Sequence, residues 1–183
     1  FRDQEKSKKE FWEFTLRYPR RYATLKNCVN CIGDYLLHSK NSKHCFNVQH
    51  MEDCKYWERG DAPKDCYDGF VGGECNQCYE GLTPDQSYRN LFGMYSWRDT
   101  EVTYTDSCHS SKYLFGCVGL KKAQYCILNK QYGEEEYRAL IARIAEHMKQ
   151  IGEWGEFFPA RLSKLGYNET VAQVYYPLTQ EEV

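Results

Sequence analysis

The chain has 183 residues, ten cysteines, 16% aromatic residues and a formal net charge of −2. Its length suits one domain with a buried core, and its charge creates no overall field that would attract nucleic acid or an anionic lipid surface. No apolar run approaches the about 20 residues that a membrane-spanning helix needs, so we expect no membrane partner.

Residues 1–38 are expected to form an N-terminal helix and a lead-in cap. A helix is predicted over about residues 4–16, with its aromatic side chains Phe11, Trp12 and Phe14 facing inward. The chain opens on Phe rather than Met, which we interpret as the sign of a processed chain or of an excised part of a longer protein.

Residues 39–132 contain an internal repeat with a period of 21 residues. Two columns of small residues share this period over four units, about 39–59, 60–80, 81–101 and 102–122. The columns are Cys45, Cys66, Ser87 and Cys108, and Cys54, Cys75, Ser96 and Cys117. Short apolar runs broken by Gly, Pro, Asn and Asp predict short strands, and stacked units of this kind predict a β-solenoid with one turn per repeat. A meander of hairpins would share the period.

The exchange of cysteine for serine at Ser87 and Ser96 indicates why the columns exist. Serine has nearly the volume of cysteine, but it cannot close a disulfide and is a poor zinc ligand. We therefore interpret both columns as structural ladders of small side chains in a tight interior, with free thiols. Free thiols favour a reducing cytoplasm.

Three other uses of the cysteines were weighed against this structural one. Disulfides between neighbouring turns are geometrically feasible, but the serine exchanges argue against them. A zinc site of four thiolates could use two C-x-x-C pairs, and a catalytic thiol would need a nearby histidine. The zinc candidates are Cys28, Cys31, Cys75 and Cys78. His44 and His109 adjoin cysteines, but adjacent residues of a strand point to opposite faces. No cofactor and no catalytic residue are predicted.

Residues 133–152 are expected to form a C-terminal capping helix. Apolar residues recur with a helical period from Tyr137 to Ile151, three glutamates occupy the first turn, and Gly152 follows the last. Residues 153–183 are expected to form an extended tail, because they are rich in Trp, Phe, Tyr and Pro and have little periodicity. Such a segment should lie along the domain or along a partner.

The segments YCILNKQY and GYNETVAQVYYPLT, with the flanking residues of 116–137 and 152–179, carry a resemblance to known sequences. The chain resembles, over nearly its whole length, a group of uncharacterised Cys- and Tyr-rich repeat proteins of uncultivated bacteria. Members often carry zinc-ribbon-like C-x-x-C modules upstream. The resemblance implies that this chain is the C-terminal part of a larger protein, and it implies no activity and no catalytic residues.

The favoured function is a non-catalytic binding or scaffold module with an unknown protein partner. It depends on the repeat, the small-residue core and the lack of any catalytic constellation in the sequence, and the module would present a flat face and an aromatic tail. Candidate contact residues are Trp57, Trp97 and Trp154.

Two alternatives remain open. A carbohydrate-active or carbohydrate-binding solenoid would use aromatic rings and surface carboxylates, the candidates being Asp53, Asp65, Asp68 and Glu74. A zinc-linked, nucleic-acid-associated protein would use the basic N-terminal residues beside the first C-x-x-C pair, which are Arg17, Arg20, Arg21 and Lys26. The net charge of −2 argues against this second alternative.

Overall fold

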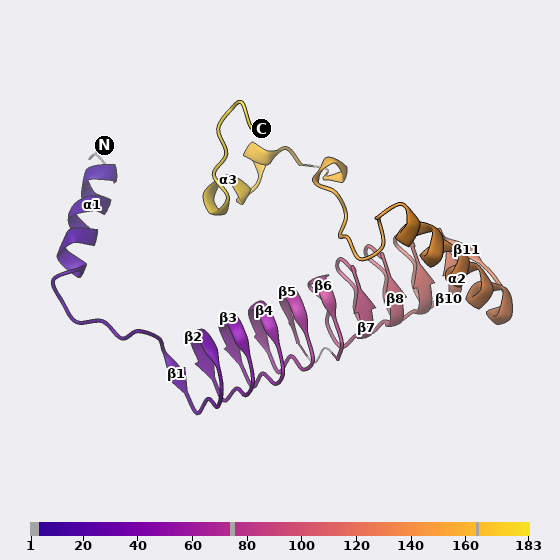
Figure 1. Cartoon of the computed structure of the whole chain (residues 1–183), viewed down its shortest axis with the longest axis horizontal. Coiled ribbons are helices and arrows are strands. Elements are labelled where there is room, and N and C mark those ends of the chain that lie inside the picture. The colour runs from indigo at the N-terminus through magenta and orange to yellow at the C-terminus, as the bar shows by residue number, and fades with distance from the viewer. Residues whose placement is uncertain (1–3, 74–75, 164) are drawn as a thin grey trace.

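The chain forms a row of parallel strands flanked by helices, as its computed structural model shows (Figure 1). The structure describes residues 4–73, 76–163 and 165–183. Helix α1 (Gln4–Thr15) precedes the strands, and α2 (Glu134–Gln150), the short helices η1 (Ala160–Leu162) and η2 (Tyr167–Glu169), and α3 (Ala172–Tyr175) follow them. The strands are β1 (Leu25–Lys26), β2 (Ile32–Leu37), β3 (Lys43–Gln49), β4 (Lys55–Asp61), β5 (Tyr67–Gly73), β6 (Tyr79–Leu82), β7 (Tyr88–Leu91), β8 (Thr100–Thr103), β9 (Lys112–Phe115), β10 (Gln124–Ile127) and β11 (Lys130–Gln131).

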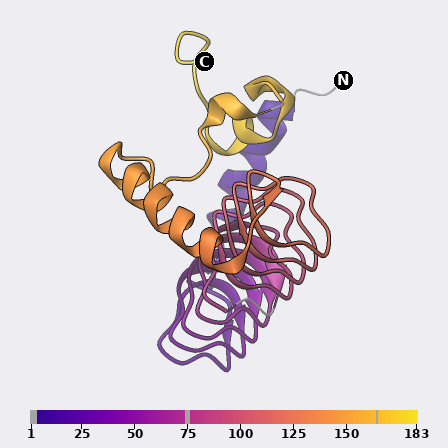
Figure 2. The same cartoon turned by 90° about the vertical axis from the view of Figure 1, so that its right-hand side faces the viewer.

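The strands pair in sequence order in one sheet, and all pairs from β1 to β10 are parallel. Lys43 pairs with Lys55, and Lys55 pairs with Tyr67, so that successive coils are 12 residues apart. Figure 2 shows the stacked coils nearly end-on. The predicted β-solenoid with flanking helices is therefore confirmed, but its coil is 12 residues long and not 21.

The coil is built from triplets, which are groups of three successive residues. The 21-residue repeat in the sequence concealed this shorter period. Every third residue from Asn41 to Val71 has a positive φ, between 48° and 60°, and the residue after it points into the solenoid. Left-handed backbone is tolerated best by Gly, Asn, Asp and His. The sequence supplies these residue types at six successive triplets: His38, Asn41, His44, Asn47, His50 and Asp53.

The two predicted cysteine columns are buried but not superposed. Twenty-one is a multiple of three, so a 21-residue step leads from one inward position to another; it is not a multiple of 12, so it also moves to a different side of the coil. Cys45 stacks between Gly33 and Trp57, whereas Cys66 stacks between Cys54 and Cys78. The described members of both columns are buried: Cys45, Cys54, Cys66, Ser87, Ser96, Cys108 and Cys117. Cys75 lies outside the described residues.

Small residues line the interior because each coil encloses little space. The largest fully buried side chain, Trp57, lies against Gly69 of the next coil, where a Cβ would collide with the indole ring. The Trp57 Nε1–H donates a hydrogen bond of 3.1 Å to the carbonyl of Arg59, which satisfies its one polar atom. The absence of a side chain at Gly69 thus makes room for the Trp57 indole.

The C-terminal end of the solenoid is covered as predicted. Strand β11 pairs antiparallel with β10, and α2 follows it. Tyr137 of α2 is buried in a cluster with Phe92, Phe115 and Ile127, and Gly152, at φ 77°, follows the helix. The helix thus packs its predicted apolar stripe on this cluster from Tyr137 to Met148, and Ile151 at its end is 52% exposed.

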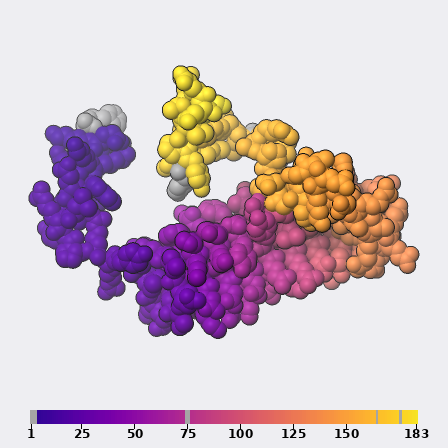
Figure 3. Space-filling model, in the orientation of Figure 1, coloured from indigo at the N-terminus to yellow at the C-terminus, as the bar shows by residue number. Residues whose placement is uncertain are grey.

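The flanks beyond these caps differ from expectation. Helix α1 has no buried residue, and Phe11, Trp12 and Phe14 are more than half exposed, so the prediction that they face inward is wrong. Figure 3 shows α1 standing away from the solenoid. The tail divides in two. Its first part packs on the solenoid through Trp154, Phe157 and Phe158, and residues 165–183 are mostly exposed.

Candidate functional site

One corner of the solenoid carries a row of aromatic side chains, which we call the aromatic ridge. It consists of Tyr67, Tyr79, Phe92, Tyr104 and Phe115, contributed by successive coils. The rings of Phe92 and Tyr104 stack with centroids 4.7 Å apart, and Tyr79 meets Phe92 edge-on at 5.3 Å. Parallel coils place residues 12 apart directly above one another, and the ridge combines two neighbouring columns of this kind. Tyr67, Tyr79 and Phe115 lie in one column, and Phe92 and Tyr104 lie in the next.

The segment 153–163 covers the C-terminal half of the aromatic ridge. The Tyr104 hydroxyl donates to the carbonyl of Glu153 at 3.3 Å and accepts from the N–H of Gly155 at 3.0 Å. Trp154 and Phe158 contact the Tyr104 ring edge-on, at 6.2 and 6.1 Å between centroids. Burial raises the pKa of Tyr104, so its hydroxyl stays protonated and keeps both hydrogen bonds. Tyr104 is therefore the anchor of this segment.

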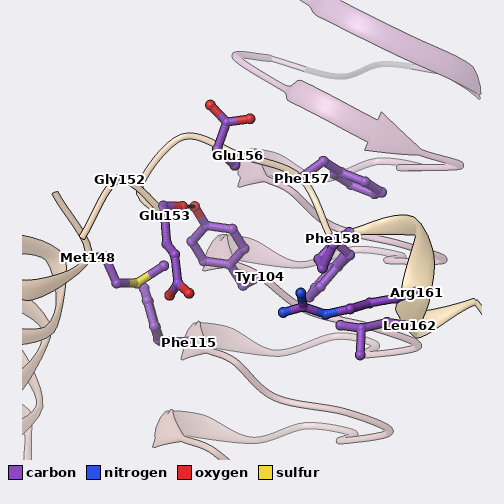
Figure 4. Close-up of a pocket in the computed structure, with 11 residues that line it drawn as sticks. Tyr104, Phe115, Met148, Gly152, Glu153, Glu156, Phe157, Phe158, Arg161 and Leu162 are labelled. Carbon is purple, nitrogen blue, oxygen red and sulfur yellow. Dashed lines mark hydrogen bonds between the residues drawn. The ribbon is translucent and has the colours of Figure 1, made fainter.

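An open pocket of about 580 Å³ lies between the segment and the ridge (Figure 4). Its walls combine rings with three charged residues of the segment, Glu153, Glu156 and Arg161. The side chains of Phe115 and Met148 face the pocket beside Tyr104. Such a wall suits apolar groups that carry a polar end.

The other half of the ridge is uncovered. Phe157 marks the boundary, and a second pocket, of about 270 Å³, opens there beside Asp68, Phe70, Glu80 and Leu82. Phe70 and Tyr79 are 41% and 38% exposed.

Three carboxylates gather at this boundary. Asp68 and Glu80 are one coil apart in the same column, and Glu156 comes from the covering segment. Burial, followed by the charges of Asp68 and Glu156, raises the pKa of Glu80; burial raises the pKa of Asp68. Carboxylates beside aromatic rings can accept hydrogen bonds from hydroxyl groups while the rings cover an apolar face.

The structure separates the other carboxylates predicted from the sequence. Asp53 and Asp65 superpose one coil apart in a different column, where Asp53 accepts a hydrogen bond of 3.0 Å from Asn41. Of the predicted set only Asp68 lies at the ridge, and Glu74 is outside the described residues. Glu80 was not among the carboxylates predicted from the sequence, although a 12-residue step from Asp68 leads to it.

Of the four predicted zinc ligands the structure describes Cys28, Cys31 and Cys78, and Cys78 lies far from the other two. Cys31 and Cys78 occupy the same inward column, four coils and therefore about 19 Å apart. Among the residues that the structure describes, no group of three or more Cys, His, Asp or Glu side chains could hold a metal ion. Cys28 and Cys31 remain as a pair at the N-terminal end.

The buried thiols lack the surroundings of a nucleophile. Burial raises the pKa of Cys45 and of Cys108 to about 11. His44 points outward and stacks on Tyr56, with centroids 5.2 Å apart. These thiols are protonated at neutral pH, as core side chains should be.

The three tryptophans predicted as contact residues have different positions. Trp57 is fully buried, so that prediction is wrong for it, because its indole fills the coil interior. Trp154 packs on Tyr104 and Phe115. Trp97 is 49% exposed and stacks on His109.

No described helix combines the length and apolar character that crossing a membrane requires. No protein-family model matches the sequence, and no curated protein matches it.

Two solved structures show low similarity to the chain. One is the UDP-N-acetylglucosamine O-acyltransferase (LpxA) from Moraxella catarrhalis RH4, at 10% identity and a TM-score of 0.24, covering 73% of this chain and 93% of that one. The other is a putative acetyltransferase from Desulfovibrio desulfuricans G20, at 11% identity and a TM-score of 0.21, covering 69% of this chain and 40% of that one. TM-scores of this size support no functional argument.

Proposed function

We propose that the chain is a non-catalytic binding module and that the uncovered half of the aromatic ridge is its binding face. The proposed ligand is an extended protein segment with apolar side chains. One observation supports the proposal: the chain's own segment 153–163 binds the other half of the same ridge through Trp154 and Phe158.

The uncovered face has the composition of an interaction surface. Large aromatic side chains such as those of Tyr and Trp are enriched among residues that dominate binding energy. Tyr79 is a partly exposed member of the ridge, and Phe70 lies with Phe157 at the second pocket beside it. A partner segment would therefore meet rings from both the solenoid and the tail.

Selection from a displayed peptide library tests this proposal. Peptides selected on the wild-type protein should bind Phe70→Ser and Tyr79→Ser at least about tenfold more weakly, because each change removes about 1.4 kcal/mol or more of contact energy. The matched control is Tyr88→Ser, whose ring is 40% exposed in a different column. Equal losses in all three variants, or no selectable peptide, would contradict the proposal.

A second candidate ligand is a carbohydrate. It is favoured by the gathering of Asp68, Glu80 and Glu156 beside Phe70 and Phe157. A glycan array, combined with a sugar-release assay, tests it. Asp68→Asn and Glu80→Gln should abolish glycan binding, whereas Asp53→Asn should leave it unchanged. If the wild-type protein neither binds a glycan on the array nor releases sugar, this candidate is contradicted.

A further inference from the structure

The N-terminal end of the solenoid is open, in contrast to the C-terminal end. Within the described residues, β1 is the first strand of the sheet and pairs only with β2. Three apolar side chains of this first coil are exposed: Leu25 by 44%, Val29 by 65% and Ile32 by 48%. An unpaired strand edge with apolar side chains is a template for association with another chain.

Two cysteines lie at inward positions of this open coil. Cys28 and Cys31 are half-buried, whereas the seven other described cysteines are buried. The Cys28 thiol donates to the carbonyl of Leu36 at 3.3 Å, and the Cys31 thiol donates to that of Val29 at 3.4 Å. Both cysteines pack against the same buried cluster, which includes Leu36 and Cys45. The two thiols are therefore partly exposed, three residues apart in the first coil.

The segment that leads into this pair is basic. From Phe14 to Gly33 the chain carries four basic residues and no acidic residue. Two N-terminal ends that approach each other therefore repel, unless an anion lies between them.

We propose that one Zn²⁺ joins two copies of this chain head to head through Cys28 and Cys31 of each copy. Structural zinc takes four ligands in a tetrahedron, and four thiolates are a common set. Each chain supplies two of them, so a two-fold axis through the ion completes the set. Four thiols lose four protons as one Zn²⁺ binds, which leaves a cluster of charge −2 between the two basic segments. Leu25, Val29 and Ile32 of both copies become buried in the same interface.

A second copy is the proposed occupant because the residues that the structure describes supply only half of a four-thiolate set. No third Cys, His, Asp or Glu joins the pair among the described residues. The next cysteine in the column of Cys31 is Cys54, two coils further into the solenoid and fully buried. This zinc site lies at the opposite end from segment 153–163, so it is independent of the proposed binding face.

Zinc titration of the full chain, reduced and freed of metal by a chelator, tests the proposal. Size-exclusion chromatography with light scattering should show the mass double from 21.7 kDa as zinc is added, with half an equivalent of zinc bound per chain. Co²⁺ in place of Zn²⁺ should give the visible absorption of tetrahedral cobalt with four thiolates. A chelator should restore the monomer.

Variants distinguish this site from adventitious binding. Cys28→Ser and Cys31→Ser should each lose both the bound zinc and the dimer, with unchanged circular dichroism. Cys126→Ser, at the covered end of the solenoid, should retain both. A monomer that binds one zinc ion per chain, a dimer that forms without zinc, or an absence of zinc binding would each overturn the proposal.

Discussion

Each inward residue of the solenoid is enclosed by its own coil and by the coils on either side. Cysteine suits such a position because it is small, apolar and unbranched, and its thiol can donate to a carbonyl nearby. The Cys108 thiol, for example, donates to the carbonyls of Asp106 and Cys117, at 3.6 and 3.5 Å. The Cys108 side chain thus fills a buried position, and its thiol is hydrogen-bonded there.

Thiol labelling measures how the accessibility of the half-buried cysteines differs from that of the buried ones. Iodoacetamide applied to the native protein should modify Cys28 and Cys31 rapidly, because these are the half-buried members of the described set. The others should react only after denaturation, since thiolate is the reactive form and burial raises the pKa of thiols such as Cys45 to about 11. Peptide mass spectrometry gives the sites. Rapid labelling of Cys54 or Cys108 in the native state would contradict the assignment.

Asp99 is the one carboxyl group among the buried polar side chains, and it makes stability depend on pH. It is 1% exposed, its Oδ1 accepts from the N–H of Ser111 at 2.7 Å, and its Oδ2 has no partner among the described residues. Burial raises its pKa from 3.8 to about 6. Because the folded-state pKa lies above the unfolded one, its contribution to stability is full below about pH 4 and is lost as pH rises through about 6.

Replacement of Asp99 by Asn isolates this effect. Between about pH 4 and pH 8, the free energy of unfolding of the wild type should fall by up to about 3 kcal/mol relative to that of Asp99→Asn. Urea unfolding of both proteins across this range measures the difference. A difference that stays constant with pH would show that Asp99 does not titrate in the folded state.

At the level of elements, the coils fit together through complementary volumes. Glycine at position 69 leaves room for the Trp57 indole, and the register Trp57–Gly69–Gly81 repeats the small residue one coil further on. The residue with positive φ before each inward position turns the backbone and so sets the direction of the chain. The side chains that fit inside one coil thus depend on the space that the side chains of the neighbouring coil leave unfilled.

Gly69→Ala tests this complementarity. The added Cβ would overlap the Trp57 ring, so the free energy of unfolding should fall by about 3 kcal/mol, at the upper end of overpacking costs. The double variant Trp57→Leu, Gly69→Ala should recover part of this loss relative to the sum of the single changes. Gly133→Ala is the control, because nothing lies within 4 Å of its Cβ position, and it should cost at most about 1 kcal/mol. Strict additivity of the two core changes would contradict the proposed fit.

At the level of the whole molecule, the solenoid is a linear stack in which each coil contacts its neighbours. One end is covered by β11 and α2, and the aromatic ridge runs along one corner to segment 153–163. The open N-terminal end and the uncovered part of the ridge are separate surfaces. The architecture thus offers two independent places for a partner.

Deletion of one coil tests the 12-residue period. Removal of residues 43–54 joins Ser42 to Lys55 in the native register, so this variant should keep cooperative unfolding and the β-type circular dichroism spectrum. Removal of residues 43–51 deletes three triplets, so inward residues stay inward, but every later column moves to the next side of the coil. This variant should lose cooperative unfolding. Equal behaviour of the two variants would contradict a 12-residue coil.

The β-solenoid, the helix 134–150 and the burial of the small residues could be predicted from the sequence. Two columns of small residues at a 21-residue period, and an apolar stripe at helical period, are local properties of the chain. They also revealed Asp68 as a surface carboxylate and Cys28 and Cys31 as the pair outside the repeat.

Only the tertiary structure decided which inward residues superpose and which surface residues meet. The length of a coil depends on how many triplets close one turn, and a 21-residue step satisfies the triplet period as well as a 12-residue step does. The gathering of Asp68, Glu80 and Glu156 requires both the true register and the path of segment 153–163. The exposure of α1 likewise depends on the tertiary structure. The helix has no buried residue, and no local period in the sequence indicates this.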